Sequence, residues 1–195
     1  MNHESWWRIR GGVMQAINHR QGLRIAAAAV AGFLLWMGES SPPQVRAERL
    51  PENGWQLLAV AVPDDRDVEL AMGGAERTLT SKGLAKVNWE NNVASVELNL
   101  EGLPGPAEAG WTAAQYVLWA VDNEKRTMNL GPVPASGSKA ELSVQVPFRI
   151  FGLLVTAEKN PQTSSPSTAV ALESLLPTDP RLVVPVFRVN LTLAP

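Results

Sequence analysis

Residues 113–133, AAQYVLWAVDNEKRTMNLGPV, contain the pattern of a single β-hairpin. An apolar run ending in Leu118 and Trp119 meets the turn residues 122–125, and a second short run then ends at a Gly–Pro pair. Asp and Asn favour turns because their side chains bond to nearby backbone groups. Since successive strand residues point to opposite faces, we expect at least one of Tyr116 and Trp119 to face outward or to lie at a sheet end.

The same period of two continues on both sides of this hairpin. Gly, Pro and Asn turns separate the apolar runs. In residues 160–180 we expect a loop with one short helical turn at residues 171–176, and Pro185 indicates an edge strand or a bulge. The pattern predicts a mainly β fold, an antiparallel Ig-like β-sandwich of about eight or nine strands. The predicted strands are residues 55–62, 67–72, 84–89, 93–100, 115–121, 126–131, 140–146, 151–158 and 181–193.

Residues 25–38, IAAAAVAGFLLWMG, form the longest uncharged apolar stretch near the N-terminus. As a helix these 14 residues would be roughly 21 Å long, which also suits a signal peptide with cleavage after Ala47. Leu23 and a snorkelling Arg24 lengthen the stretch, so we favour an uncleaved transmembrane helix at residues 23–38. The expected membrane-anchoring side chains are Leu23, Ile25, Val30, Phe33, Leu34, Leu35 and Trp36.

The distribution of arginine predicts how this span is oriented. Four arginines precede the uncharged stretch at residues 25–38 and two follow it closely, so the N-terminus is expected in the cytoplasm of a bacterium, with the main domain in the periplasm. The predicted organisation is a cytoplasmic amphipathic segment (1–22), a helix in the inner membrane (23–38), a linker (39–53) and a periplasmic β-sandwich (54–195).

The segment before the span has an amphipathic stripe at helical spacing, with apolar residues at i, i+3, i+7 and i+11. It is either a helix lying on the membrane surface or a docking site for another membrane subunit. Its start, SWWRIR, resembles the start of light-harvesting antenna polypeptides, but the span lacks the histidine that ligates their pigment. The interface candidates are Trp6, Trp7, Ile9, Val13 and Ile17, with Phe187, Val189 and Leu191 in the last predicted strand.

Composition excludes several kinds of chemistry. The chain has no cysteine, and its only histidines, His3 and His19, precede the span, so the main domain has no thiolate or imidazole for catalysis or for zinc. Acidic residues outnumber basic ones after Met37, which argues against nucleic-acid binding. The acidic run at residues 64–69 lacks the glycine and the distal glutamate of a calcium loop and indicates a solvated turn. We therefore expect no catalytic residue, metal or cofactor.

A Leu-Pro…Gly loop at residues 103–110, a Tyr-x-Leu-Trp-x-x-Asp strand at 116–122, a Leu-Gly pair at 130–131 and a Thr-x-Glu…Pro stretch at 156–161 follow one another along the chain. With this order of motifs, residues 84–172 resemble the extracytoplasmic C-terminal domain of anti-sigma-K-type factors. The resemblance implies a domain used for protein contact. Such factors hold their sigma partner with a helical cytoplasmic domain, whereas about 22 residues precede the span here. The positions that carry the resemblance are Leu103, Pro104, Gly110, Tyr116, Leu118, Trp119, Asp122, Leu130, Gly131, Thr156, Glu158 and Pro161.

Three functions follow as expectations. The first is a non-catalytic, membrane-anchored accessory subunit that stabilises a bacterial membrane protein complex, in a photosynthetic or respiratory energy-converting assembly. Its partners would be membrane protein subunits and the lipid bilayer. The second is a degenerate anti-sigma-factor-like envelope regulator. The third, a carboxylate-based hydrolase, requires a pair of facing carboxylates in a cleft.

Overall fold

The structure is a computed structural model that describes residues 49–50, 53–113, 115–134 and 139–195. The described residues contain no helix, and all strand pairings between them are antiparallel, which confirms the predicted mainly β, antiparallel fold. The strands are β1 (Arg49–Leu50), β2 (Gly54–Ala61), β3 (Val68–Gly74), β4 (Lys82–Glu90), β5 (Val93–Glu101), β6 (Gln115–Asp122), β7 (Thr127–Val133), β8 (Lys139–Val146), β9 (Ile150–Glu158), β10 (Val170–Pro177) and β11 (Val186–Thr192).

Eight of these strands form one curled sheet in the order β7-β6-β9-β10-β3-β4-β5-β8. Its two outermost strands, β7 and β8, contact one another, so the sheet nearly closes on itself. Short turns suit this arrangement. Between β4 and β5, Asn91 and Asn92 have φ values of 53° and 64°, the left-handed conformation that a two-residue hairpin turn requires and that Asn tolerates.

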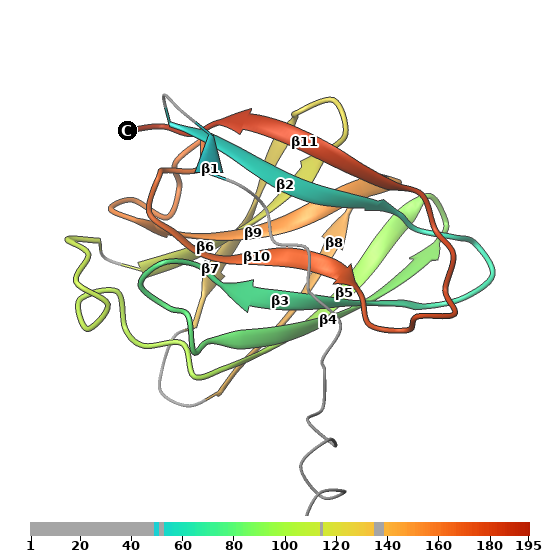
Figure 1. Cartoon of the computed structure of the whole chain (residues 1–195), viewed down its shortest axis with the longest axis horizontal. Coiled ribbons are helices and arrows are strands. Elements are labelled where there is room, and N and C mark those ends of the chain that lie inside the picture. Colours follow the sequence, from blue (N-terminus) through green and yellow to red (C-terminus); the bar gives the residue numbers. More distant parts are fainter. Residues whose placement is uncertain (1–48, 51–52, 114, 135–138) are drawn as a thin grey trace, which may run out of the picture. The chain divides into compact units, whose positions relative to one another are not determined.

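The remaining strands, β1, β2 and β11, form what we call the ribbon. β2 pairs with β9 only through Val60 and Ala61, and from Leu154 onward the same edge of β9 pairs with β10 instead. We call the point where β2 and β10 diverge along β9 the fork. Beyond this fork β2 pairs with β11 along its whole length, and the two lie side by side in Figure 1. β1 lies within the predicted linker and pairs with the start of β2.

The fork creates two hydrophobic cores instead of one. Inside the curled sheet, Tyr116, Leu118 and Ala120 of β6 pack in the first core. On the other face of the same strand, Val117, Trp119 and Val121 pack in the second core with residues of the ribbon. Both faces of β6 are therefore buried, although a strand at a sheet surface would expose one of them.

Three details of the predicted strands are wrong. Tyr116 and Trp119 are both fully buried, because each face of β6 has its own core. Residues 171–176 are not a helical turn but lie in β10, whose pairing with β3 and β9 supplies its backbone hydrogen bonds. The last strand begins at Val186, after Pro185, whereas residues 181–185 were expected to belong to it.

Candidate functional site

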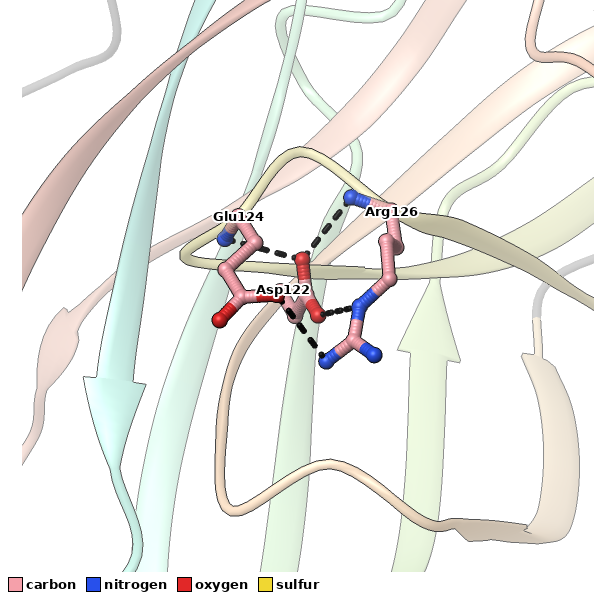
Figure 2. A network of polar contacts seen from close by, with 3 residues as sticks. All are labelled: Asp122, Glu124 and Arg126. Atoms are coloured by element: carbon pink, nitrogen blue, oxygen red, sulfur yellow. Dashed lines mark hydrogen bonds and ion pairs between the residues drawn. The ribbon is translucent and has the colours of Figure 1, made fainter.

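A compact polar network surrounds Asp122 at the turn between β6 and β7, at one end of the β-domain. One carboxylate oxygen of Asp122 accepts hydrogen bonds from the backbone N–H groups of Glu124 and Arg126, at 2.9 and 2.8 Å. The other oxygen accepts from Nε of Arg126, as Figure 2 shows. The Asp122 side chain is 2% exposed whereas that of Arg126 is 65% exposed. The carboxylate therefore fixes the turn and holds an arginine at the surface.

Two arginines at this end stack on aromatic rings. The Arg126 guanidinium lies 5.4 Å from the ring centroid of Phe148, and that of Arg149 lies 4.8 Å from Trp89. Arg149 also bonds the Asp64 carboxylate at 2.5 Å, which holds the pKa of that carboxyl below its usual range. We call this group the Arg–aromatic end. Its contacts join the β2–β3 loop, the β6–β7 turn, the β8–β9 loop and the end of β4, so the surface is held in one arrangement.

The acidic run at residues 64–69 belongs to the same end. Its carboxylates have separate partners, since Asp65 pairs with Arg66 at 2.6 Å and Asp67 pairs with Lys86 at 3.0 Å. A hydrogen bond from Asn88, followed by one from Lys86, lowers the pKa of Asp67. Within the described ranges, no group of three or more acidic or imidazole side chains is arranged to hold a metal ion.

The opposite end contains a series of buried hydrogen bonds that the strand pattern did not predict. Nε1 of Trp119 donates to the Thr156 hydroxyl at 2.8 Å, and that hydroxyl donates to Oε1 of Glu158 at 2.5 Å. The same oxygen accepts from the backbone N–H of Ser167 at 2.8 Å. One signal was present in the sequence, because Thr156 and Glu158 are polar residues in an otherwise apolar run and a buried polar group needs a partner.

Glu158 also lines a pocket of about 330 Å³ at this end. Trp111, from the loop before β6, and Asn160, from the loop after β9, line the same pocket. The Asn129 amide of β7 donates to the carbonyl oxygens of Pro161 and Thr163, both at 2.9 Å, so the loop beside the pocket is fixed. The pocket therefore combines an aromatic side chain, Trp111, with a buried carboxylate, Glu158.

The buried carboxylates do not meet as a catalytic pair. Asp122 and Glu158 lie at opposite ends of the β6–β9 pairing, where they face Phe151 and Gln115. Seven residues of strand separate these positions, or roughly 23 Å. Paired carboxylates of glycoside hydrolases lie within about 9.5 Å of each other, so these two cannot share a substrate. The third buried carboxylate is that of Glu173, which lies opposite Leu154 of β9. Along β9, Leu154 is about 13 Å from Glu158.

The predicted interface residues of β11 divide between core and surface. Val189 and Leu191 are only 3% and 5% exposed and belong to the second core, whereas Phe187 is 37% exposed. The other candidates, Trp6, Trp7, Ile9, Val13 and Ile17, lie outside the described residues, as do all the predicted anchor side chains. Of the residues that are described, none forms a helix long and apolar enough to cross a membrane.

β11 has an open edge. It pairs with β2 and with no other described strand. Ala61 N–H donates to the carbonyl oxygen of Pro185, and Leu193 N–H donates to that of Asn53. Bonding alternates along an antiparallel pair, so odd-numbered residues of β11 bond to β2. The backbone groups that point away from β2 are those of Val186, Arg188, Asn190 and Thr192.

Comparison with known proteins does not identify the chain: no protein-family model matches it, and no curated protein or solved structure is significantly similar to it. The resemblance to the anti-sigma-K-type domain therefore stays a prediction. Three of the positions that carry it, Trp119, Thr156 and Glu158, are joined in the hydrogen-bonded series at the pocket end.

Proposed function

We propose that this chain is a non-catalytic accessory subunit, anchored in the bacterial inner membrane by residues 23–38, that stabilises a membrane protein complex through its periplasmic domain. We assign that domain to the Ig-like sandwich class, with the ribbon and the curled sheet as its layers. The host is an energy-converting assembly, respiratory or photosynthetic. The partners are membrane protein subunits and the lipid bilayer.

The open edge of β11 is the observation that carries this proposal. Proteins that work alone usually protect such an edge with a short strand, a bulge or a cover, because its unpaired groups bind other strands. Here Val186 and Phe187 are 40% and 37% exposed at the start of β11, and Val183 just before it is 94% exposed. An extended segment of a partner can add to this edge and cover these side chains.

A mild-detergent purification of the full chain through a C-terminal tag, with mass spectrometry of the intact assembly, tests the proposal. We expect a fixed set of membrane subunits to copurify with a chain that still begins at Met1. A chain that runs alone, or that begins at Glu48, would contradict it.

Two matched variants locate the contact. Arg188→Pro removes an N–H that points away from β2, so it should release the partners while the fold persists. Arg188→Ala removes the same charge but keeps the N–H, and should retain the partners. Equal copurification with both variants would argue against the β11 edge as the contact.

The second candidate function is a degenerate anti-sigma-factor-like envelope regulator. It is favoured by the resemblance over residues 84–172, whose positions Trp119, Thr156 and Glu158 bond to one another. The same purification separates the two functions, since a regulator would copurify with a soluble or substoichiometric signalling protein rather than with fixed membrane subunits.

A further inference from the structure

We propose that the pocket lined by Glu158 and Trp111 binds a saccharide, either a free sugar or the sugar headgroup of a glycolipid. Its volume of about 330 Å³ lies at the lower end of the range for small-molecule sites, which suits one or two sugar rings. The binding of a sugar depends on the pocket alone. The glycolipid source rests on the proposed membrane anchor.

Glu158 provides the acceptor in this pocket. Its side chain is 5% exposed, and its Oε1 already accepts from the Thr156 hydroxyl and the Ser167 N–H. No other described residue donates to Oε2, and Oε2 is not among the buried atoms that lack a partner, so it is open to water in the pocket. A ligand hydroxyl that donates to Oε2 can take the place of that water.

Trp111 provides the aromatic side chain, and its neighbours hold it in place. Its ring packs edge-on against Tyr116, with centroids 5.9 Å apart and an interplanar angle of 88°. The Arg77 guanidinium lies 5.7 Å from the same ring and donates to the carbonyl oxygen of Gly110. A fixed indole offers apolar area at low entropic cost, which suits the C–H face of a sugar ring.

Donors in the same pocket make a hydroxylated ligand fit better than an ion. The side-chain oxygen of Asn160 accepts the N–H of Gln162 at 3.0 Å, which leaves its amide NH₂ to donate. Lys159 is exposed and adds an ammonium group. Lys159 disfavours a cationic ligand and Glu158 disfavours an anionic one, whereas each sugar hydroxyl both donates and accepts.

Ser167 and Thr168 complete the lining of the pocket beside Glu158. A glycolipid headgroup and a free periplasmic sugar offer the pocket the same hydroxyl groups and ring faces, so the experiment separates the two sources.

Saturation-transfer NMR on the full chain tests the first source, with glucose, galactose and N-acetylglucosamine as probes. The chain is kept in lauryldimethylamine oxide, because glycoside detergents would compete for the pocket. Binding to nanodiscs of phosphatidylcholine, with or without monoglucosyl diacylglycerol, tests the second source. We expect saturation transfer from the protein to at least one free sugar, or stronger binding to the glucolipid discs. Because free sugars reach the pocket of an unanchored domain too, failure of the anchor leaves the first test intact.

Three variants assign the binding to this pocket. Glu158→Gln keeps the acceptor for Thr156 and Ser167 but replaces Oε2 by a donor, and should weaken binding about tenfold, or about 1.4 kcal/mol. Trp111→Ala should abolish binding, with circular dichroism to verify folding. Glu141→Gln, in a separate groove of about 440 Å³ over β4, β5 and β8, should leave binding unchanged. No binding of any probe to the folded wild-type chain overturns the proposal, as does equal binding by Glu158→Gln and the wild type.

Discussion

Ser174 of β10 donates its hydroxyl proton to the carbonyl oxygen of Leu58 in β2, over 3.0 Å, at the point where the ribbon leaves the curled sheet. The same hydroxyl accepts the N–H of Leu153 in β9, also at 3.0 Å. Gly152 and Leu153 of β9 lie between the part that pairs with β2 and the part that pairs with β10. Without Ser174, the Leu153 N–H and the Leu58 carbonyl oxygen would therefore be buried without a partner. One side chain thus completes the hydrogen bonding of two strands.

Ser174→Ala should lower the free energy of unfolding by about 2–4 kcal/mol, because it leaves two buried backbone groups unpaired. Urea denaturation followed by circular dichroism measures the change. Ser143→Ala, on the exposed face of β8, is the matched control and should change stability by less than about 0.5 kcal/mol. Equal stability of the two variants would show that the hydroxyl does not hold the fork.

Gly152→Ala should also destabilise the fork. A Cβ at Gly152 would lie 2.2 Å from the carbonyl oxygen of Leu58, a backbone atom that cannot turn aside. The expected loss is about 2–3 kcal/mol by the same denaturation measurement. Gly105→Ala serves as control, since the atom nearest to its Cβ would be 3.7 Å away. If Gly152→Ala leaves the free energy of unfolding unchanged, β2 and β9 lie farther apart at this point than the 2.2 Å contact requires.

Tyr116→Phe should raise the free energy of unfolding at neutral pH by about 1 kcal/mol. The ring is fully buried, and its hydroxyl has no hydrogen-bond partner among the described residues. Phenylalanine keeps the packing and removes the unpaired group. Thermal or urea unfolding measures the difference, and a destabilised variant would reveal a partner for the hydroxyl.

The same tyrosine predicts a loss of stability in alkali. Burial raises the pKa of Tyr116 to about 12, from an ordinary value of 10.0. Below pH 10 both the folded and the unfolded chain keep the proton; above it only the unfolded chain loses it, so stability falls as pH rises from 10 to 12. Tyr116 is the only tyrosine, so absorbance near 295 nm reports its ionisation directly. Tyr116→Phe should lack this loss, and ionisation near pH 10 in the folded chain would contradict the prediction.

Asp122→Ala should cost about 2–4 kcal/mol of unfolding free energy, because the turn from β6 to β7 loses an acceptor for two backbone N–H groups. Asp122→Asn retains that acceptor and loses the charged contact with the exposed Arg126, so it should cost about 1 kcal/mol. A double-mutant cycle with Arg126→Ala separates the two contributions. If both substitutions at Asp122 lower the free energy of unfolding equally, the ion pair with Arg126 stabilises the domain and the hydrogen bonds to the turn do not.

The sequence predicts most of the strands because alternation survives wherever one face is solvated. β5 alternates between exposed and buried residues along nearly its whole length, and its predicted and observed starts coincide at Val93. The turn at Asn91 and Asn92 was predictable for a different reason, since the amide side chains tolerate the left-handed backbone that joins β4 to β5.

Prediction fails where a strand has a core on each side. Residues 170–175 of β10 are all buried, so the run lacks the alternation that distinguishes a strand from a helix. Tyr116 and Trp119 were misjudged for the same reason. Nothing local to β6 tells that strands 60 residues away in the chain will cover its second face.

The candidate site was only partly predictable. Asp122 was expected in a turn and does cap it. The acidic run at residues 64–69 was expected on a solvated turn; Asp64, Asp65 and Asp67 lie on the loop before β3, whereas Glu69 lies on the exposed face of β3. The pocket was not predicted, because it joins Trp111 to Glu158 across loops of unrelated sequence. Thr156 and Glu158, as polar residues in an otherwise apolar run, gave one usable signal, since a buried polar group requires a partner such as the indole N–H of Trp119.

The pairing of β2 with β11 determines when this domain can fold. The two strands are separated by more than 120 residues, and Trp55 and Leu57 of β2 share the second core with Leu191 of β11. Such distant contacts pay the loop-closure cost before any stabilisation is gained, which makes folding slow. While the chain emerges from the ribosome or a translocation channel, β2 can pair with β1 and, at Val60 and Ala61, with β9, but the strand that covers most of its length is missing until Thr192 is free. Until then the second core lacks Val189 and Leu191, so its remaining apolar side chains are a binding site for a holding chaperone.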